Sequence, residues 1–148
     1  MSEKIVEIET FSQDIYKFVC RLTRQLSPNR NGPTEESFCN ILDSESVHLL
    51  VLYDDNETPV AMLTIGVYRT PTGYKAWIED VVVDNAYRGQ GYGRKLVAGA
   101  IDFCKTIGVD AISLTSNPLR TVANQLYQVL GFSLYETNVY KMELEKTV

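Results

Sequence analysis

The segment that decides the fold runs from Trp77 to Ile107 and reads WIEDVVV (77–83), RGQGYGR (88–94) and KLVAGAIDFCKTI (95–107). The first part is β-branched and apolar apart from two adjacent acids, which predicts a largely buried strand. In the last part apolar residues recur at helical spacing, so we expect a helix over 91–107. Three glycines at alternate positions between them favour unusual backbone conformations and a close approach to a ligand.

A strand, a glycine-rich turn and a helix start together predict an anion site. The first N–H groups of a helix lack internal partners, and the helix dipole places about half a positive charge there. Arg88 and Arg94 flank the turn and add two full charges. The turn is not a dinucleotide fingerprint, because position 94 carries Arg where that motif needs its third glycine. Nor does Gly93-Arg94-Lys95 match the Gly-Lys-Ser/Thr of nucleoside-triphosphate loops.

The segment Arg88-Gly89-Gln90-Gly91-Tyr92-Gly93 resembles the acetyl-CoA motif Q/R-x-x-G-x-G/A of the GCN5-related N-acetyltransferases, the GNAT family. A second block, in the order and spacing typical of that family, comprises Leu114–Arg120, Ala123–Tyr127 and Gly131-Phe132. The resemblance covers roughly residues 47–144. On these two motifs the chain is identified as a member of the GNAT family.

The resemblance implies the GNAT fold, a mixed α/β sheet that is mostly antiparallel, with about seven strands, one parallel pair and about four flanking helices. The expected strands lie at 5–8, 47–53, 59–68, 74–83, 111–115, 132–135 and 140–144, the last two as a closing hairpin. The expected helices lie at 11–26 with Ser12 as N-cap, from the cap Thr34 to Leu42, at 91–107, and before Gly131. The chain is expected to be a single domain over 1–148.

Composition narrows the function classes. The chain has 148 residues, 45% hydrophobic and 22% charged, which is ordinary for a soluble globule. Its net charge of −5 argues against a nucleic-acid footprint. We expect no signal peptide and no membrane segment, and hence a cytoplasmic protein. Cys20, Cys39 and Cys104 lack metal-type spacing; Cys20 and Cys104 fall on apolar helix faces, which predicts buried free thiols and no metal site.

The family resemblance implies acetyl-CoA (coenzyme A) as acyl donor. Pantetheine would then pair with the backbone of the strand residues Val81, Val82 and Val83. The pyrophosphate would bind backbone N–H groups of the glycine turn. The residues of that turn are Arg88, Gly89, Gln90, Gly91, Tyr92, Gly93 and Arg94.

The family resemblance also implies a general base and a proton donor. Glu79 resembles the acid that serves many members as general base, and the alternative is a solvated strand residue. The period of two places Asp80 on the opposite strand face unless a bulge re-aims it, and a bulge there is common in the family. Tyr127 occupies the position of the family's phenol, which donates to the CoA sulfur; the alternative is a packing aromatic.

One position departs from the family pattern. Seven residues before the tyrosine the family often has Asn bonded to pantetheine, and this chain has Arg120. Asn117 and Asn124 lie close enough in sequence to substitute, while Arg120 has the charge to bind a phosphate or an anionic acceptor. All three, with Tyr127, are expected to contribute to cofactor binding. His48, the only histidine, is expected to be structural.

The favoured function is transfer of an acetyl group to the amine of a small-molecule acceptor. The residues 78–80 and 87–91 look locally like those of glucosamine-phosphate N-acetyltransferases, but the likeness fades after Ala111. Acetylation of a protein or peptide amine and a non-catalytic acyl-CoA-binding module stay open as alternatives, as does a homodimer. Tyr68, Tyr74, Trp77 and Tyr87 are candidates for an acceptor pocket, or for ordinary sheet packing.

Overall fold

The computed structural model describes residues 2–146, which divide into a compact unit ending at Thr115 and a second beginning at Ser116. The elements of the first are β1 (Lys4–Glu7), α1 (Gln13–Leu26), α2 (Glu35–Asp43), β2 (Val47–Tyr53), β3 (Pro59–Thr70), β4 (Gly73–Val83), a 3₁₀ turn (Asn85–Tyr87), α3 (Tyr92–Ile107) and β5 (Ala111–Ser113). The second contains α4 (Thr121–Val129). None of the described helices has the length and hydropathy that a membrane span requires.

Helices α1 and α2 begin at residues whose side chains accept from a first-turn amide, and α3 ends at a glycine. Ser12 accepts a hydrogen bond from the Ile15 amide and caps α1, as predicted. Thr34 caps α2 by accepting from the Ser37 amide. Helix α3 ends at Gly108, whose left-handed backbone (φ 85°) lets its amide bond back to the last turn.

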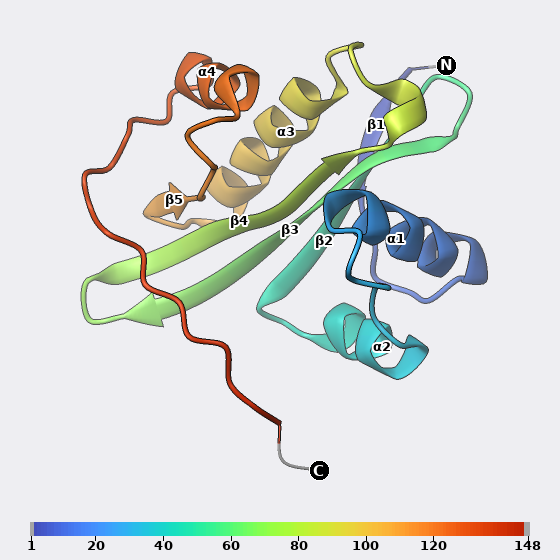
Figure 1. Ribbon diagram of the computed structural model, residues 1–148, viewed down its shortest axis with the longest axis horizontal. Coiled ribbons are helices and arrows are strands. Elements are labelled where there is room, and N and C mark those ends of the chain that lie inside the picture. The colour runs from blue at the N-terminus through green and yellow to red at the C-terminus, as the bar shows by residue number, and fades with distance from the viewer. Residues whose placement is uncertain (1, 147–148) are drawn as a thin grey trace. The chain divides into compact units, whose positions relative to one another are not determined.

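Five strands form one sheet in the order β1-β2-β3-β4-β5 among the described residues (Figure 1). Strands β1 to β4 are antiparallel neighbours, and β5 runs parallel to β4 after the crossover through α3. The predicted mixed sheet with one parallel pair is therefore confirmed. The predicted number of about seven strands is wrong, because the sheet has five.

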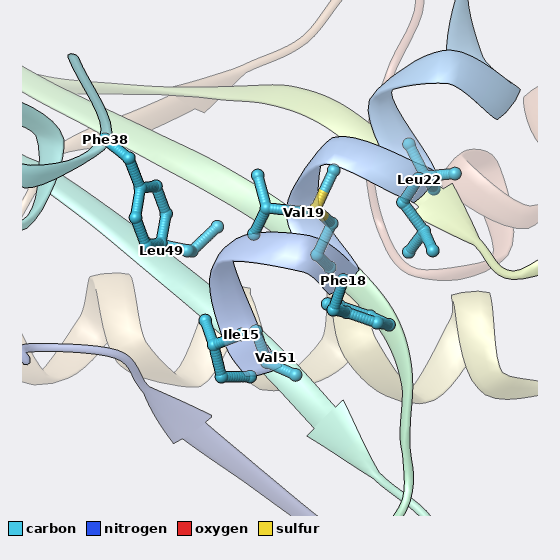
Figure 2. Close-up of a cluster of buried hydrophobic side chains, with 9 residues drawn as sticks. Ile15, Phe18, Val19, Leu22, Phe38, Leu49 and Val51 are labelled. Atoms are coloured by element: carbon cyan, nitrogen blue, oxygen red, sulfur yellow. The ribbon is translucent and has the colours of Figure 1, made fainter. Parts of the chain in front are cut away.

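Helices α1 and α2 cover one face of the sheet and α3 covers the other (Figure 1). The core under α1 and α2 joins four side chains of α1 to Phe38, and Figure 2 shows them over β2. Its buried members are Ile15, Phe18, Val19, Leu22, Phe38, Leu49, Val51, Met62 and Val82. Helix α3 buries Leu96, Val97, Ala100 and Cys104. Cys20 and Cys104 are buried free thiols, as predicted.

Strand β4 contains a bulge that changes which face its residues use. Ile78 lies opposite Ile65, and Val82 lies opposite Met62. Met62 and Ile65 are three positions apart in β3, an odd number, so these two side chains point to opposite faces of the sheet. Ile78 and Val82, four residues apart, therefore also face opposite ways, which requires an extra residue in β4. The register shifts there, and Asp80 has a left-handed backbone (φ 53°).

In the second unit the predicted helix before Gly131 is confirmed as α4, but the closing hairpin over 132–135 and 140–144 is wrong. Residues 132–146 form neither helix nor strand. Alternating apolar and polar residues form a strand only where a neighbouring strand supplies backbone partners, and the described sheet ends at β5. The large apolar side chains of this segment are exposed: Leu134, Tyr135, Val139, Tyr140, Met142 and Leu144.

Candidate active site

Strand β4 leaves much of one edge open. Its parallel pairing with β5 ends at Trp77 opposite Ser113, so residues 78–83 have no strand partner on that edge within the described part of the chain. The Asp84 amide donates to the Val60 carbonyl of β3, and the Val83 carbonyl on the same peptide therefore points to the open edge. Val81 to Val83 thus lie where backbone groups of a ligand can pair with them, and pantetheine binding there stays a prediction. The Arg88 Nε already donates to the Val83 oxygen, at 3.1 Å.

The open edge leads directly into the glycine turn. Gly89 (φ 80°) and Gly91 (φ 82°) have left-handed backbones, which side-chain-bearing residues disfavour. A Cβ at Gly93 would contact only Val83 Cγ2, at 3.5 Å, so the start of α3 packs against the end of β4. Gly91 is the N-cap of α3 and supplies no side-chain cap. The amide N–H groups of residues 89–94 have no hydrogen-bond acceptor among the described residues.

Two cations remain available at this turn. Arg94 forms no ion pair with any described residue, and Arg88 uses its Nε while its outer nitrogens have no partner there. Lys95, in contrast, donates to both carboxylate oxygens of Glu3 at 2.7 Å. Free N–H groups, a helix N-terminus and two arginines are groups that can bind an anion, and a diphosphate site at Gly89–Arg94 stays a prediction.

Asp84, which the sequence did not single out, ties the turn to α1. Its buried carboxylate accepts hydrogen bonds from Arg21 Nη2 (3.0 Å), Gln25 Nε2 (3.2 Å) and the Ala86 amide (3.2 Å). Gln25 Oε1 in turn accepts from the Asn85 amide. Burial alone would raise the pKa of Asp84, but the hydrogen bonds and the Arg21 charge outweigh it and lower that pKa. The only signal in the sequence was an acid directly after a buried strand.

Glu79 and Asp80 lie at the bulge, and both side chains are exposed. Glu79 lies opposite Thr64, on the sheet face that α1 and α2 cover further along. The prediction of a largely buried strand is therefore wrong, because only Ile78 and Val82 are buried between residues 77 and 83. Neither carboxylate forms a hydrogen bond or ion pair with the described residues, so both are available to a ligand.

The predicted residues of the second unit gather at α4. Tyr127 is only 8% exposed and packs edge-on against Phe132. Its hydroxyl forms no hydrogen bond with a described residue. Burial raises the pKa of Tyr127, while the positive charge of Arg120 acts in the opposite direction.

The two asparagines proposed as substitutes for the family's amide are used within this unit. Asn124 Nδ2 donates to the backbone oxygens of Asn117 (2.9 Å) and Arg120 (2.7 Å), which orders the start of α4. Asn117 Oδ1 accepts from the Leu119 amide. Asn117 therefore keeps its Nδ2 group for other partners, whereas Asn124 keeps only its Oδ1 acceptor. Asn124 has no side-chain donor left for a cofactor.

His48, in β2, lies on the sheet face under α3. Its Nδ1 is 2.6 Å from Glu7 Oε2, and its ring packs on Phe103 with 4.9 Å between centroids. These contacts are those of a structural residue, as predicted.

Comparison with known proteins places this geometry in a family. The family model described as Acetyltransferase (GNAT) family matches residues 13–132. An uncharacterized N-acetyltransferase of Bacillus subtilis (strain 168) is 28% identical over 94 residues, which are 63% of this chain and 66% of that protein.

Two solved structures have the same fold. The glucosamine-6-phosphate N-acetyltransferase of Arabidopsis thaliana has a TM-score of 0.77 and 24% identity, covering 96% of this chain and 99% of that one. An aminoglycoside acetyltransferase from an uncultured soil metagenomic sample has a TM-score of 0.83 and 21% identity, covering 97% of each chain. Since the family model spans most of the sequence and includes the glycine turn, the chain belongs to the acetyltransferase (GNAT) family.

Proposed function

We propose that the protein is an N-acetyltransferase that moves the acetyl group of acetyl-CoA to the amine of a small-molecule acceptor. One observation carries the proposal: the open edge of β4 runs into a turn whose amides are free and whose helix is uncapped. Coenzyme A combines a strand-like arm bearing amides with a diphosphate. The open edge of β4 can pair with the amides of the arm, and the free amides of the glycine turn can bind the diphosphate.

The residues present fit this group in order along β4 and α3. The backbone of Val81–Val83 would hold the pantetheine arm, and the amides of Gly89–Arg94 would hold the diphosphate. Arg88 and Arg94 would add charge-assisted hydrogen bonds to its oxygens. Bound acetyl-CoA supplies an acyl carbon activated as a thioester. The rest of the chemistry concerns where protons go.

The acceptor amine must lose a proton before it can attack. With a pKa near 10, only about one part in a thousand of an alkylamine is free at neutral pH, a deficit of about 4 kcal/mol. The exposed Glu79 carboxylate, unpaired with any described residue, would accept that proton directly or through one water. Asp80 beside it adds a second negative charge that attracts an ammonium to this part of the strand.

The leaving sulfur must gain a proton or a hydrogen bond. We assign this role to Tyr127 because its hydroxyl has no partner among the described residues. Burial raises the pKa of Tyr127, so the phenol keeps its proton at neutral pH and can donate. Arg120 would bind an anionic group of either substrate. Its charge also eases proton release from the phenol.

We infer the nature of the acceptor from two observations. The two solved structures are named for acceptors that are amines on sugars, glucosamine 6-phosphate and aminoglycosides. Both names refer to small molecules, which supports a small amine rather than a protein as the acceptor. Exposed acids at the bulge also favour a cationic acceptor.

The test measures thiol release from acetyl-CoA across a panel of small amines and short peptides, with wild type and Glu79→Gln. We expect release with at least one small amine, and a fall in kcat/KM of about 10²–10⁴-fold in Glu79→Gln. Asp55→Asn, a matched change of an exposed acid in the β2–β3 turn, should leave the rate unchanged. Release only with peptides would favour a protein acetyltransferase. Acetyl-CoA binding without release would favour a non-catalytic module.

A further inference from the structure

A second group of residues lies beside Glu79 on the same face of the β3–β4 hairpin. In the register, Thr64 lies opposite Glu79, and Gly66 lies opposite Trp77. Tyr68 follows Gly66 at the next position of the same face. The tip of the β3–β4 hairpin extends beyond α1 and α2 (Figure 1), and the members of the core under those helices do not include Thr64, Gly66, Tyr68, Trp77 or Glu79. We call Gly66, Tyr68, Trp77 and Glu79 the platform.

The aromatic rings of the platform are held in place. Trp77 Nε1 donates a hydrogen bond to the Tyr68 hydroxyl at 2.9 Å, which fixes the two side chains across the strand pair. This bond uses the single donor of the indole. The Tyr68 hydroxyl acts as acceptor in it and keeps its own proton to donate elsewhere. Tyr68 is 44% exposed.

Open space adjoins the indole. On the β3 side, the cross-strand neighbour of Trp77 is Gly66, so no β3 side chain stands directly opposite the indole there. A Cβ built on Gly66 would have no heavy atom of residues 2–146 within 4 Å. Glycine weakens a strand interior, and it is often found where a ligand approaches the sheet closely. The glycine leaves room for a flat group beside Trp77.

Charge completes the site. Glu79 follows Trp77 by two residues, so their Cα atoms lie about 7 Å apart along the strand and their side chains share one face. A carboxylate free of partners next to an aromatic face is the combination that binds an ammonium. The spacing fits a molecule whose amine is one short linker away from a flat apolar group.

We propose that the platform binds the acceptor, and that the acceptor is a primary amine joined to a ring by a short linker. The ring would lie on Trp77 in the space over Gly66. The amine would lie at Glu79, and a polar ring substituent would receive the Tyr68 proton. This inference rests on the proposed function for the fate of the amine, but it makes separate claims about binding.

Binding is measured directly, because Trp77 is the only tryptophan of the chain. Phenethylamine is titrated while tryptophan is excited selectively, with butylamine as the ligand that lacks a ring. We expect saturable quenching by phenethylamine, with a Kd about 5- to 30-fold lower than that of butylamine. Equal dissociation constants for the two amines, or no saturable change with either, would overturn the platform.

The decisive variant is Gly66→Val. Gly66 does not have a left-handed backbone, its Cβ meets nothing, and valine favours strands, so the variant should fold. The new side chain fills the space beside Trp77. We expect the phenethylamine Kd to rise about 10-fold or more, while the acetyl-CoA Kd changes less than about 2-fold. An unchanged phenethylamine Kd in Gly66→Val would contradict the inference.

A matched control lies on the opposite face of the same hairpin. Tyr74 pairs with Arg69, whose guanidinium stacks 3.9 Å from its ring centroid. Tyr74→Leu removes an aromatic ring without touching the platform, so it should leave both dissociation constants unchanged. Trp77→Leu should reduce the preference for phenethylamine in kcat/KM by about 5- to 30-fold. Binding with no thiol release would overturn the proposed transfer and leave the platform standing.

Discussion

The two units of the protein bury their apolar side chains to very different extents. Among the described residues, every buried apolar side chain except that of Tyr127 precedes Thr115. No large apolar side chain of the first unit is more than 44% exposed. Those that are exposed in the second unit range from 65% at Val129 to 89% at Tyr140.

The difference shows that a strand-like sequence pattern does not by itself produce a β-strand. Residues 47–53 and 140–144 both have the composition of strands, yet only the first has strand neighbours on both sides. Local sequence predicts the strand, whereas backbone pairing and a buried face stabilise it. The stability of the protein should therefore depend on the first unit, and the second should contribute mainly through Tyr127.

The difference between the two units is tested most directly by truncating one buried and one exposed apolar side chain. Phe38 is fully buried, and Leu144 is 80% exposed. We expect Phe38→Ala to lower the free energy of unfolding by about 3–5 kcal/mol, because it leaves a cavity in the core. Leu144→Ala should change it by less than about 0.5 kcal/mol. Urea unfolding followed by circular dichroism measures both, and similar losses would contradict the comparison.

Two tyrosines of the second unit, Tyr127 and Tyr135, allow an effect on catalysis to be distinguished from an effect on stability. Tyr127→Phe removes a hydroxyl that has no partner among the described residues, so stability should barely change. We expect kcat to fall by about 10- to 10³-fold with an unchanged acetyl-CoA Kd. Tyr135→Phe, at a residue 82% exposed, should leave kcat unchanged. An unchanged kcat in Tyr127→Phe would remove its assigned role.

Substitution of Asp84 tests whether polar contacts of the first unit contribute to the free energy of unfolding, as its apolar core does. Asp84→Asn weakens the hydrogen bonds from Arg21 and Gln25, and we expect a loss of about 1–3 kcal/mol at pH 7. The pKa of Asp84 is lower in the folded protein than in the unfolded chain. Its carboxylate therefore stabilises the fold above the unfolded pKa of about 3.9, and this contribution is lost as pH falls through the folded pKa.

The measurement is unfolding free energy from pH 7 to pH 3 for wild type, Asp84→Asn and the exposed-site control Asp55→Asn. The gap between wild type and Asp84→Asn should be constant near neutral pH and should narrow below about pH 4. A gap that does not depend on pH would show that the charge of Asp84 adds nothing.

The smallest effect is expected at a helix cap. Ser12 accepts from the Ile15 amide at 3.2 Å, and Ser12→Ala should cost about 1 kcal/mol. Ser133→Ala, at an exposed residue outside any helix or strand, should cost nothing measurable. Thermal unfolding of the two variants compares them, and equal melting temperatures would show that α1 does not need its cap.

Sequence reasoning located the helices and strands up to Ser113 because caps, turns and apolar periodicity there agree with the tertiary structure. It also found the glycine turn, since left-handed positions at Gly89 and Gly91 restrict residue choice strongly. The contacts of Asp84 were out of reach, because Arg21 and Gln25 are about 60 residues away in sequence. Which residues face which side of β4 depended on the bulge at Asp80. Periodicity alone misses such a bulge.

The central claim is that the turn between β4 and α3 holds the diphosphate of acetyl-CoA. Backbone amide chemical shifts of ¹⁵N-labelled protein, followed during titration with acetyl-CoA, test it residue by residue. The account predicts saturable shifts concentrated at the amides of 88–94, with further shifts along 78–83. Shifts confined to other residues, or no shifts at millimolar acetyl-CoA, would contradict it.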